Sequence, residues 1–191
     1  MIDPADGWAY CGLGTASVIL SPSEEALEYC MKGVTKIQDE YTHAALGFGY
    51  EKKQMFTEAI KQYNSSISKD PKYFISYYNL GRIYLIGGYY DLAIKEFKEV
   101  LKILPKYPHA HSNLGVAYWY KGRIVDAELE FKEAILCNEN LVEAHYNLAI
   151  LYEEMGKYEK AVSCLKRVLS IMPDLESARR RLERLYREIK R

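Results

Sequence analysis

The chain has 191 residues, of which 49% are hydrophobic and 27% are charged, and its 26 Lys and Arg residues balance its 26 Asp and Glu residues. This composition is typical of one or two globular domains and not of a disordered or membrane-embedded chain. The balanced charge gives no overall field that would attract nucleic acid or an anionic membrane surface.

The sequence predicts a soluble, cytoplasmic protein. Its first residues carry acids where a secretory signal needs Lys or Arg. No stretch approaches about 18 consecutive apolar residues, the length that suggests a membrane-spanning helix. A signal or anchor that has been removed from the sequence is an alternative that these observations leave open.

Residues 1–39 contain one weak and one strong helix signal. Gly12 and Gly14 give the first part a low helix propensity, whereas Ser21 can cap a second helix and Pro22 suits its first turn. Ala26 follows Gly14 by twelve residues, a spacing that recurs later in the chain. We expect a degenerate helix pair in this segment, with an irregular lid as the alternative.

A pattern with a constant 34-residue period fills residues 40–175. In each copy a leucine precedes a small residue, a tyrosine follows three positions later, and an alanine lies twelve positions after the small residue. A large apolar side chain comes four positions after that alanine. The small residues are Gly47, Gly81, Gly115 and Ala149, the alanines are Ala59, Ala93, Ala127 and Ala161, and the large side chains are Tyr63, Phe97, Phe131 and Leu165.

The local signals within each copy are those of two helices joined by a turn. Apolar residues follow helical spacing rather than alternation. Gly88, Gly122 and Gly156 stand where a left-handed residue can end the first helix. Proline at Pro71 and Pro105 follows the second helix and prevents it from continuing.

These spacings resemble those of the tetratricopeptide repeat family, whose unit is a helix-turn-helix pair of about 34 residues. The resemblance implies an all-α fold, a right-handed superhelical solenoid with repeats at 40–73, 74–107, 108–141 and 142–175. Residues 176–191 combine an apolar stripe with many arginines, which predicts a C-terminal capping helix. A polar outer face is expected of a solenoid end, so we do not interpret its positive charge as a nucleic-acid site.

The small residue in each copy falls where the two helices of one hairpin should cross. A glycine inside a helix costs about 1 kcal/mol relative to alanine, and closer helix contact offsets this cost because it buries more of the neighbouring aromatic side chains. We therefore expect Gly47, Gly81 and Gly115 to contact the second helix of their own repeats.

The histidines do not predict a metal or catalytic site. His43, His111 and His145 occupy one repeat slot, which Tyr77 fills in the remaining strong repeat. We expect this slot to pack between helices, and residues in successive repeats should lie too far apart to share one metal ion.

The other reactive residues also form no recognisable catalytic or metal-binding motif. No CxxC pair occurs, so the cysteines are expected to be reduced and packed. Phosphate-binding, nucleophile-elbow and HExxH motifs are missing from the sequence. We therefore predict no enzyme activity and no cofactor. The four cysteines are Cys11, Cys30, Cys137 and Cys164.

In the tetratricopeptide repeat family, the first helix of each repeat lines a concave surface on which peptides generally lie. The resemblance places there one asparagine from each of three successive repeats, while aromatic neighbours can bury ligand side chains. An amide donates and accepts, so such a ladder can hold an extended backbone; a hydrogen bond to the chain's own backbone is the alternative. The predicted peptide-binding residues are Tyr41, Phe48, Tyr78, Asn79, Arg82, Asn113, Trp119, Tyr120, Tyr146 and Asn147.

One ligand class of the family is not expected. Members that clamp the carboxylates of acidic chaperone tails use Lys and Asn in one repeat and Lys and Arg in a later one. Ala44 and Phe48, then His109 and Asn113, stand at the matching places of this chain.

We therefore expect a non-catalytic adaptor that binds a peptide segment of a partner protein in a concave groove. Two alternatives stay open. One is a self-assembling homo-oligomeric scaffold in which an end or N-terminal segment of one molecule enters the groove of another. The other is a regulatory module of a larger protein.

Overall fold

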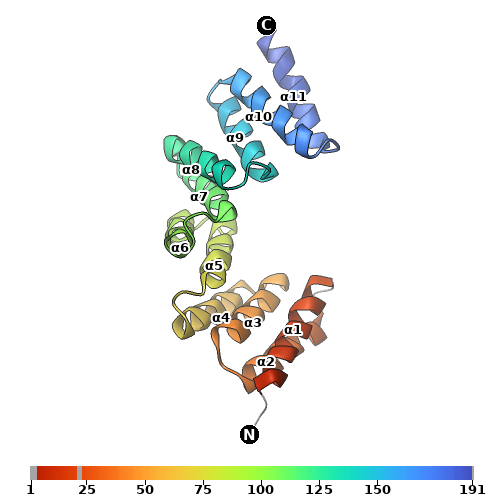
Figure 1. Cartoon of the computed structure of the whole chain (residues 1–191), viewed down its shortest axis with the longest axis vertical. Coiled ribbons are helices and arrows are strands. Elements are labelled where there is room, and N and C mark those ends of the chain that lie inside the picture. Colours follow the sequence, from red (N-terminus) through yellow and green to blue (C-terminus); the bar gives the residue numbers. More distant parts are fainter. Residues whose placement is uncertain (1–3, 21–22, 191) are drawn as a thin grey trace. The chain divides into compact units, whose positions relative to one another are not determined.

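The computed structural model describes residues 4–20 and 23–190, and the regular secondary structure of this part is entirely helical (Figure 1). The all-α fold predicted from the sequence is confirmed for these residues. Their eleven helices are α1 (Pro4–Leu20), α2 (Glu24–Lys36), α3 (Glu40–Lys52), α4 (Phe56–Lys69), α5 (Phe74–Ile86), α6 (Tyr90–Ile103), α7 (Pro108–Tyr120), α8 (Ile124–Cys137), α9 (Val142–Glu154), α10 (Tyr158–Ile171) and α11 (Glu176–Ile189).

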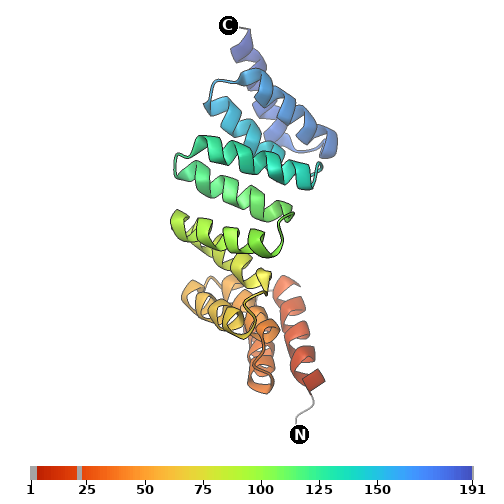
Figure 2. The same ribbon diagram turned by 60° about the vertical axis from the view of Figure 1, so that its left-hand side comes forward.

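The chain divides into two compact units, Met1–Ile103 and Leu104–Arg191. In unit 1, helices α1 and α2, α3 and α4, and α5 and α6 pack as three pairs, and α3 also contacts α1 and α5. In unit 2, α7 pairs with α8 and α9 with α10, while α11 packs against α10 (Figure 2). Each helix thus packs mainly against its neighbours in sequence, as in other stacked repeats.

The small residues lie at the helix crossings, as the sequence predicts. A Cβ atom added at Gly81 would lie 2.6 Å from the ring of Phe97, and one added at Gly115 would lie 2.8 Å from the ring of Phe131. Both aromatic side chains are fully buried. Glycine at these positions therefore lets the second helix of each hairpin bring an aromatic ring against the backbone of the first.

The first hairpin of unit 1 uses the same register with smaller side chains. A Cβ atom at Gly14 would clash with the sulfur of Cys30, sixteen residues later, which is the spacing that separates Gly81 from Phe97. Cys11 packs in turn against Gly33 of α2. This close contact explains why the predicted weak segment is a helix of seventeen residues, because packing outweighs its low propensity.

The N-terminus of α2 differs slightly from the prediction. Ser21 and Pro22, the expected cap and first-turn residues, lie outside the described residues. The N-cap is Ser23, whose hydroxyl accepts a hydrogen bond from the backbone N–H of Ala26 at 3.1 Å. Glu24 and Glu25 follow in the first turn, where negative charge favours the helix dipole.

The turns within the hairpins are closed by left-handed residues. Gly88, Gly122 and Gly156 have φ angles between +69° and +77°, and Gln54 takes the same role with a φ of +59°. The residue that follows each of them donates a backbone hydrogen bond to the carbonyl of the motif tyrosine, as in Tyr89 to Tyr84 at 2.8 Å. The pattern is that of a Schellman cap.

The slot shared by histidine and tyrosine closes the loop between repeats. The Tyr77 hydroxyl donates to the carbonyl oxygen of Pro71 at 3.2 Å, and His111 Nε2 lies 3.0 Å from that of Pro105. His145 makes the equivalent contact with Glu139. The prediction that this slot serves packing is therefore incomplete. The side chain in the slot also makes a hydrogen bond to a loop carbonyl that has no partner within a helix.

Candidate functional site

The first helices of unit 1 form an apolar cavity of about 310 Å³. Its walls come from α1, α3 and α5, and they include Tyr41, Phe48 and Asn79, three of the predicted peptide-binding residues. A volume near 300 Å³ is at the lower limit of ligand sites, so the cavity suits one aromatic or aliphatic side chain. The other lining residues are Thr15, Ala44, Ala45, Tyr73 and Ile75.

The cavity exists because two alanines interrupt the repeat pattern. Ala44 and Ala45 stand one repeat period before Tyr78 and Asn79, so a large and a polar side chain are replaced by methyl groups in α3. Both alanines are buried. The small alanine side chains leave a hollow between α3 and the neighbouring α1 and α5, and its lining is mainly apolar.

Asn79 is buried, with only 9% of its surface exposed, and it contacts other side chains of unit 1. Its Oδ1 accepts a hydrogen bond from Nη1 of Arg82 at 3.4 Å. The same Arg82 nitrogen lies 3.1 Å from Oε1 of Glu51, and the other Glu51 oxygen accepts a hydrogen bond from the Tyr63 hydroxyl at 2.9 Å. Burial and the charge of Glu51 raise the pKa of Tyr63, so that the hydroxyl stays a donor. Asn79 and Arg82 therefore belong to a network that joins α3, α4 and α5.

The aromatic residues predicted in unit 1 lie in different surroundings. Tyr41 is partly exposed at the cavity, and Phe48 is half-buried with Nζ of Lys52 5.1 Å from its ring centroid. Tyr78 packs against Phe97 of α6, with ring centroids 6.0 Å apart. Tyr41 and Phe48 thus line the hollow, whereas Tyr78 packs at the contact between α5 and α6.

The first helices of unit 2 carry a more polar surface. Glu153 of α9 accepts a hydrogen bond from Nη1 of Arg181 at 2.6 Å and a second from Arg184, which ties α11 to α9. The Arg181 guanidinium lies 5.8 Å from the ring centroid of Tyr146, within the range of a cation–π contact. A cavity of about 560 Å³ adjoins these groups; it is lined by Ile150, Glu153, Glu154, Tyr158, Arg181, Arg184, Leu185 and Glu188.

The remaining predicted residues lie on α7 and α9. Asn113 is half-buried and interacts within the chain, while the half-buried Asn147 amide makes no hydrogen bond to another described residue. Trp119 donates its indole N–H to Oε2 of Glu154 at 2.7 Å, and the exposed Tyr120 stacks on it with centroids 6.2 Å apart. Among the three asparagines, Asn147 is therefore the one whose amide has no hydrogen-bond partner among the described residues.

One feature of both units escaped the sequence reasoning. Glu51 and Arg82 stand three repeat periods before Glu153 and Arg184, and each pair forms an ion pair across adjacent first helices. Apolar residues occupy the same slots in the repeats between them. The available signal in the sequence was a Glu and an Arg that recur at the same separation in both units. We looked for catalytic and binding residues, and these charged residues instead hold neighbouring helices together.

The described residues contain no group of His, Cys, Asp and Glu side chains that could hold a metal ion. Burial raises the pKa of Cys11 to about 12 and that of Cys30 to about 11. Thiols with such pKa values are poor nucleophiles near neutral pH. Within the described part of the chain, every helix is too short or too polar to cross a membrane.

Comparison with known proteins agrees with this architecture. A family model described as TPR repeat matches residues 50–87 and 81–122, and one described as tetratricopeptide repeat matches residues 142–175. No curated protein matches the sequence.

Several solved structures share the fold. MamA from Desulfovibrio magneticus RS-1 superimposes with a TM-score of 0.76 and 17% identity, over 89% of this chain and 97% of that one. TTC0263, a thermophilic TPR protein of Thermus thermophilus, gives 0.75 and 21%, over 94% and 98%. PilF of Pseudomonas aeruginosa gives 0.81 and 18%, over 87% and 77%. At these identities the likeness concerns the fold alone, and TPR folds generally serve as protein-interaction scaffolds. Together with the 34-residue pattern and the paired helices, the matches show that the chain belongs to the tetratricopeptide repeat family.

Proposed function

We propose that the protein is a non-catalytic adaptor that binds a peptide segment of a partner protein on the inner faces of its first helices. The observation that carries this proposal is the apolar cavity of about 310 Å³ among α1, α3 and α5. It lies on the face that family resemblance assigns to peptide ligands, and it arises where two alanines stand at the slots that hold Tyr78 and Asn79 in the next repeat.

In unit 1, the anchor for such a ligand is an apolar side chain. Tyr41 and Phe48 flank the cavity, and Asn79 and Arg82 keep its wall in place through Glu51 and Tyr63. We therefore assign Asn79 a positioning role. Because Asn79 also lines the cavity, it can contact the ligand directly as well. Aromatic and aliphatic anchors commonly dominate the energy of peptide binding.

In unit 2, the ligand contact we propose is polar. The amide of Asn147 has a donor and an acceptor without partners among the described residues, so it can bind a peptide backbone. Tyr146 on α9 and the exposed ring of Tyr120 on α7 provide aromatic surface, and Trp119, which stacks on Tyr120, and Asn113 lie on α7 as well. Three hydrogen bonds contribute only about 3 kcal/mol, and micromolar affinity requires about 8 kcal/mol, so apolar burial must provide most of the affinity.

A peptide-library selection on the immobilised full chain tests the proposal. Selected peptides should bind at least about tenfold more weakly to Tyr41→Ser, because loss of a dominant aromatic anchor costs about 2 kcal/mol or more and tenfold corresponds to about 1.4 kcal/mol. Tyr186→Ser is the matched control, since Tyr186 is 39% exposed and Tyr41 is 38% exposed, but Tyr186 lies on α11 beside Lys166. Calorimetry gives the affinities. Equal binding to both variants would contradict the site in unit 1.

A further inference from the structure

Helix α8 of unit 2 exposes a stripe of large apolar side chains. It packs against α7 and α9, and the fully buried Ala127 and Phe131 mark its inner side. On the opposite side, Val125 is 71% exposed, Leu129 is 56% exposed and Leu136 is 79% exposed. These three residues lie four and seven positions apart, so they share one side of the helix. We call them the α8 outer face.

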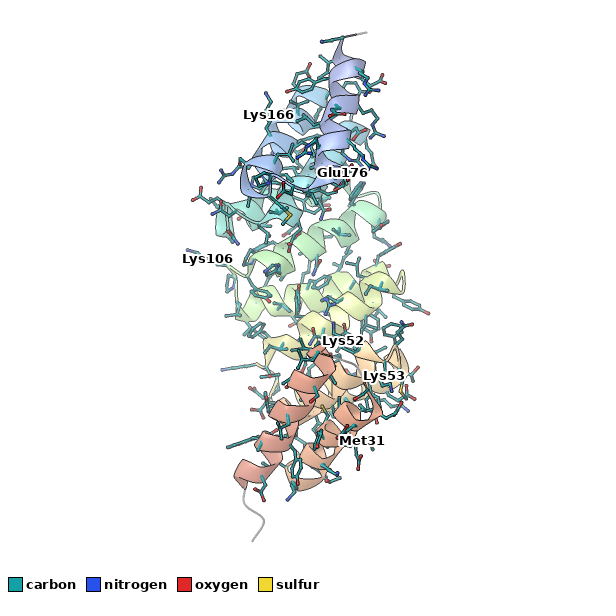
Figure 3. All side chains as sticks on the ribbon, turned by 90° about the vertical axis from the view of Figure 1, so that its right-hand side faces the viewer. Met31, Lys52, Lys53, Lys106, Lys166 and Glu176 are labelled. Carbon is teal, nitrogen blue, oxygen red and sulfur yellow. The ribbon has the colours of Figure 1, made fainter. Side chains whose placement is uncertain are left out.

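The other second helices carry polar residues at the slots of the α8 outer face. The slots recur at the 34-residue period, and their residues are Thr57, Lys61 and Ser68 on α4, Asp91, Lys95 and Lys102 on α6, and Glu159, Ser163 and Ser170 on α10. Lys132, which lies between the two leucines, is the ordinary residue of its own slot, since Lys166 of α10 stands there as well (Figure 3). A stripe of exposed apolar residues at slots that are otherwise polar indicates an interaction surface.

The charge around the α8 outer face is negative. Helix α8 contains four acidic residues and one lysine, a net charge of −3, whereas α6 contains three of each sign and α10 contains one acidic and three basic residues. The single lysine, Lys132, already pairs with Glu128 at 2.6 Å. Glu133, which is exposed three positions before Leu136, makes no ion pair or hydrogen bond with another described residue. The face therefore combines large apolar side chains with an excess of negative charge.

We propose that the α8 outer face binds a basic amphipathic helix of a partner protein. Apolar side chains on one side of that helix would pack against Val125, Leu129 and Leu136, and a flanking Lys or Arg would lie beside Glu133. The backbone groups of α8 are already bonded within the helix, so the face offers no hydrogen bonds to an extended peptide, whereas a helix satisfies its own backbone. Because α8 is the second helix of its hairpin, this contact is separate from the first-helix surface proposed above.

The same charge disfavours other occupants of the α8 outer face. A second copy that used this face would bring two helices of net charge −3 together. An anionic membrane would repel α8 in the same way, and helices that lie on membranes carry several Lys and Arg residues on their polar side. Attraction between charges on a partly exposed contact is screened by salt. The affinity for a basic helix should therefore fall as the salt concentration rises.

Fluorescence anisotropy with the full chain and two synthetic helical peptides tests the chemistry of the partner. The first peptide, of about 18 residues so that it can form a helix, carries leucines along one side and lysines elsewhere. The second has glutamate in place of every lysine. Wild type should bind the leucine–lysine peptide at least about tenfold more tightly than the leucine–glutamate peptide, and the difference should shrink at high salt.

Substitutions on α8 test the place of binding. Leu129→Lys introduces the residue that α6 carries at this slot, Lys95, and lysine is a good helix former, so the helical circular dichroism should be kept. Leu129→Lys and Leu136→Lys should each weaken binding of the leucine–lysine peptide at least about tenfold, because an apolar contact is lost and a like charge is added. Leu92→Lys is the matched control and should bind as wild type does. Leu92 is 42% exposed on α6, and Lys160 stands at its slot in α10.

The proposal fails if wild type binds neither peptide, if both peptides bind equally well, or if Leu129→Lys binds the leucine–lysine peptide as tightly as wild type does. Sedimentation velocity examines the remaining occupant. Self-association of wild type that is lost in Leu129→Lys and kept in Leu92→Lys would assign the α8 outer face to a second copy and would also overturn the proposal.

Discussion

A methyl group added at Gly81 would lie 2.6 Å from a ring carbon of Phe97, closer than two carbon atoms can approach without a shift. The gain in helix propensity from glycine to alanine is about 1 kcal/mol, and overpacking a buried contact costs about 1 to 3 kcal/mol. We therefore predict that Gly81→Ala lowers the free energy of unfolding, measured by urea denaturation at low protein concentration. Gly12→Ala is the control and should be neutral or stabilising, because its Cβ meets open space.

The repeats themselves suggest how to rescue that variant. Ala149 stands at the Gly81 slot of a later repeat, and its partner sixteen residues on is Leu165 instead of Phe97. In a Phe97→Leu background, Gly81→Ala should therefore cost less than it does alone. An equal cost in both backgrounds would mean that the small residue serves some purpose other than room for the ring.

His111 should make stability depend on pH. Burial alone would lower its pKa, but hydrogen bonds to Glu130 and the Pro105 carbonyl, together with the charges of Glu130 and Glu133, raise the pKa above 6.5. A group whose pKa is raised in the folded state stabilises the fold fully below its unfolded pKa. We predict that this contribution is lost as pH rises from about 6.5 through the folded pKa.

Tyrosine at position 111 provides the matched variant, because Tyr77 fills this slot in unit 1 and donates to the Pro71 carbonyl. His111→Tyr should keep a donor for Pro105 and remove the titration. Urea midpoints measured between pH 6 and pH 8.5 should fall with pH in wild type and fall less in the variant. The same slope in both proteins would show that another group carries the dependence.

At the scale of elements, α11 is held by charges as much as by apolar contact. Ala178 and Leu185 are its buried residues, and Glu153 binds Arg181 and Arg184 from the neighbouring α9. Hydrogen bonds between charged groups contribute about 1.5 to 3 kcal/mol when solvent is partly excluded. Glu153→Gln should therefore speed amide hydrogen exchange in α11 by about tenfold, which corresponds to about 1.4 kcal/mol.

The control for this prediction lies within α11 itself. Glu176 pairs with Arg180, but both side chains are largely exposed, and such pairs contribute only about 0 to 1 kcal/mol. Glu176→Gln should change exchange little. If the two variants behave alike, the contact of Glu153 with α11 is not what holds the helix.

The elements were largely predictable because their signals repeat. The 34-residue period places the hairpins from α3 to α10, and the glycine slots indicate which helices cross. The surroundings of single side chains were less accessible. Asn79 and Asn147 occupy the same slot, yet Asn79 belongs to a hydrogen-bonded network with Arg82 and Glu51, and the Asn147 amide makes no hydrogen bond to another described residue. Periodicity reports which face a residue occupies, and the partners on adjacent helices determine whether that residue is free.

The same argument applies to α1. Gly12 and Gly14 indicate a poor helix when the segment is considered alone. The structure pairs Gly14 with Cys30 and Gly33 with Cys11, so the glycines are the reason why α1 and α2 pack closely. Propensity scales describe an isolated helix in water. They fail where a small residue lets a neighbouring helix pack closely.

At the scale of the whole chain, the described part of the core includes several small clusters. One cluster of unit 1 contains Tyr63 and Leu80, another contains Leu27 and Leu46, and a cluster of unit 2 contains Leu141. Each joins one hairpin to the next. Stability of such a chain is approximately a sum of terms for single repeats and for neighbouring pairs. Binding surfaces on first helices can therefore vary from repeat to repeat while the crossings are kept.

This organisation predicts that a destabilising substitution affects mainly its own hairpin and the adjacent ones. Leu165 is fully buried in α10, and Leu165→Ala should cost about 2 to 5 kcal/mol because it leaves a cavity. Hydrogen exchange read peptide by peptide should show the largest loss of protection in α9, α10 and α11, and the smallest in α1 and α2. Leu136→Ala, which removes an exposed leucine from α8, should leave protection unchanged. A uniform loss along the whole chain would instead mean that all repeats unfold as one block, since a stack governed by nearest neighbours confines the defect to the hairpins that touch it.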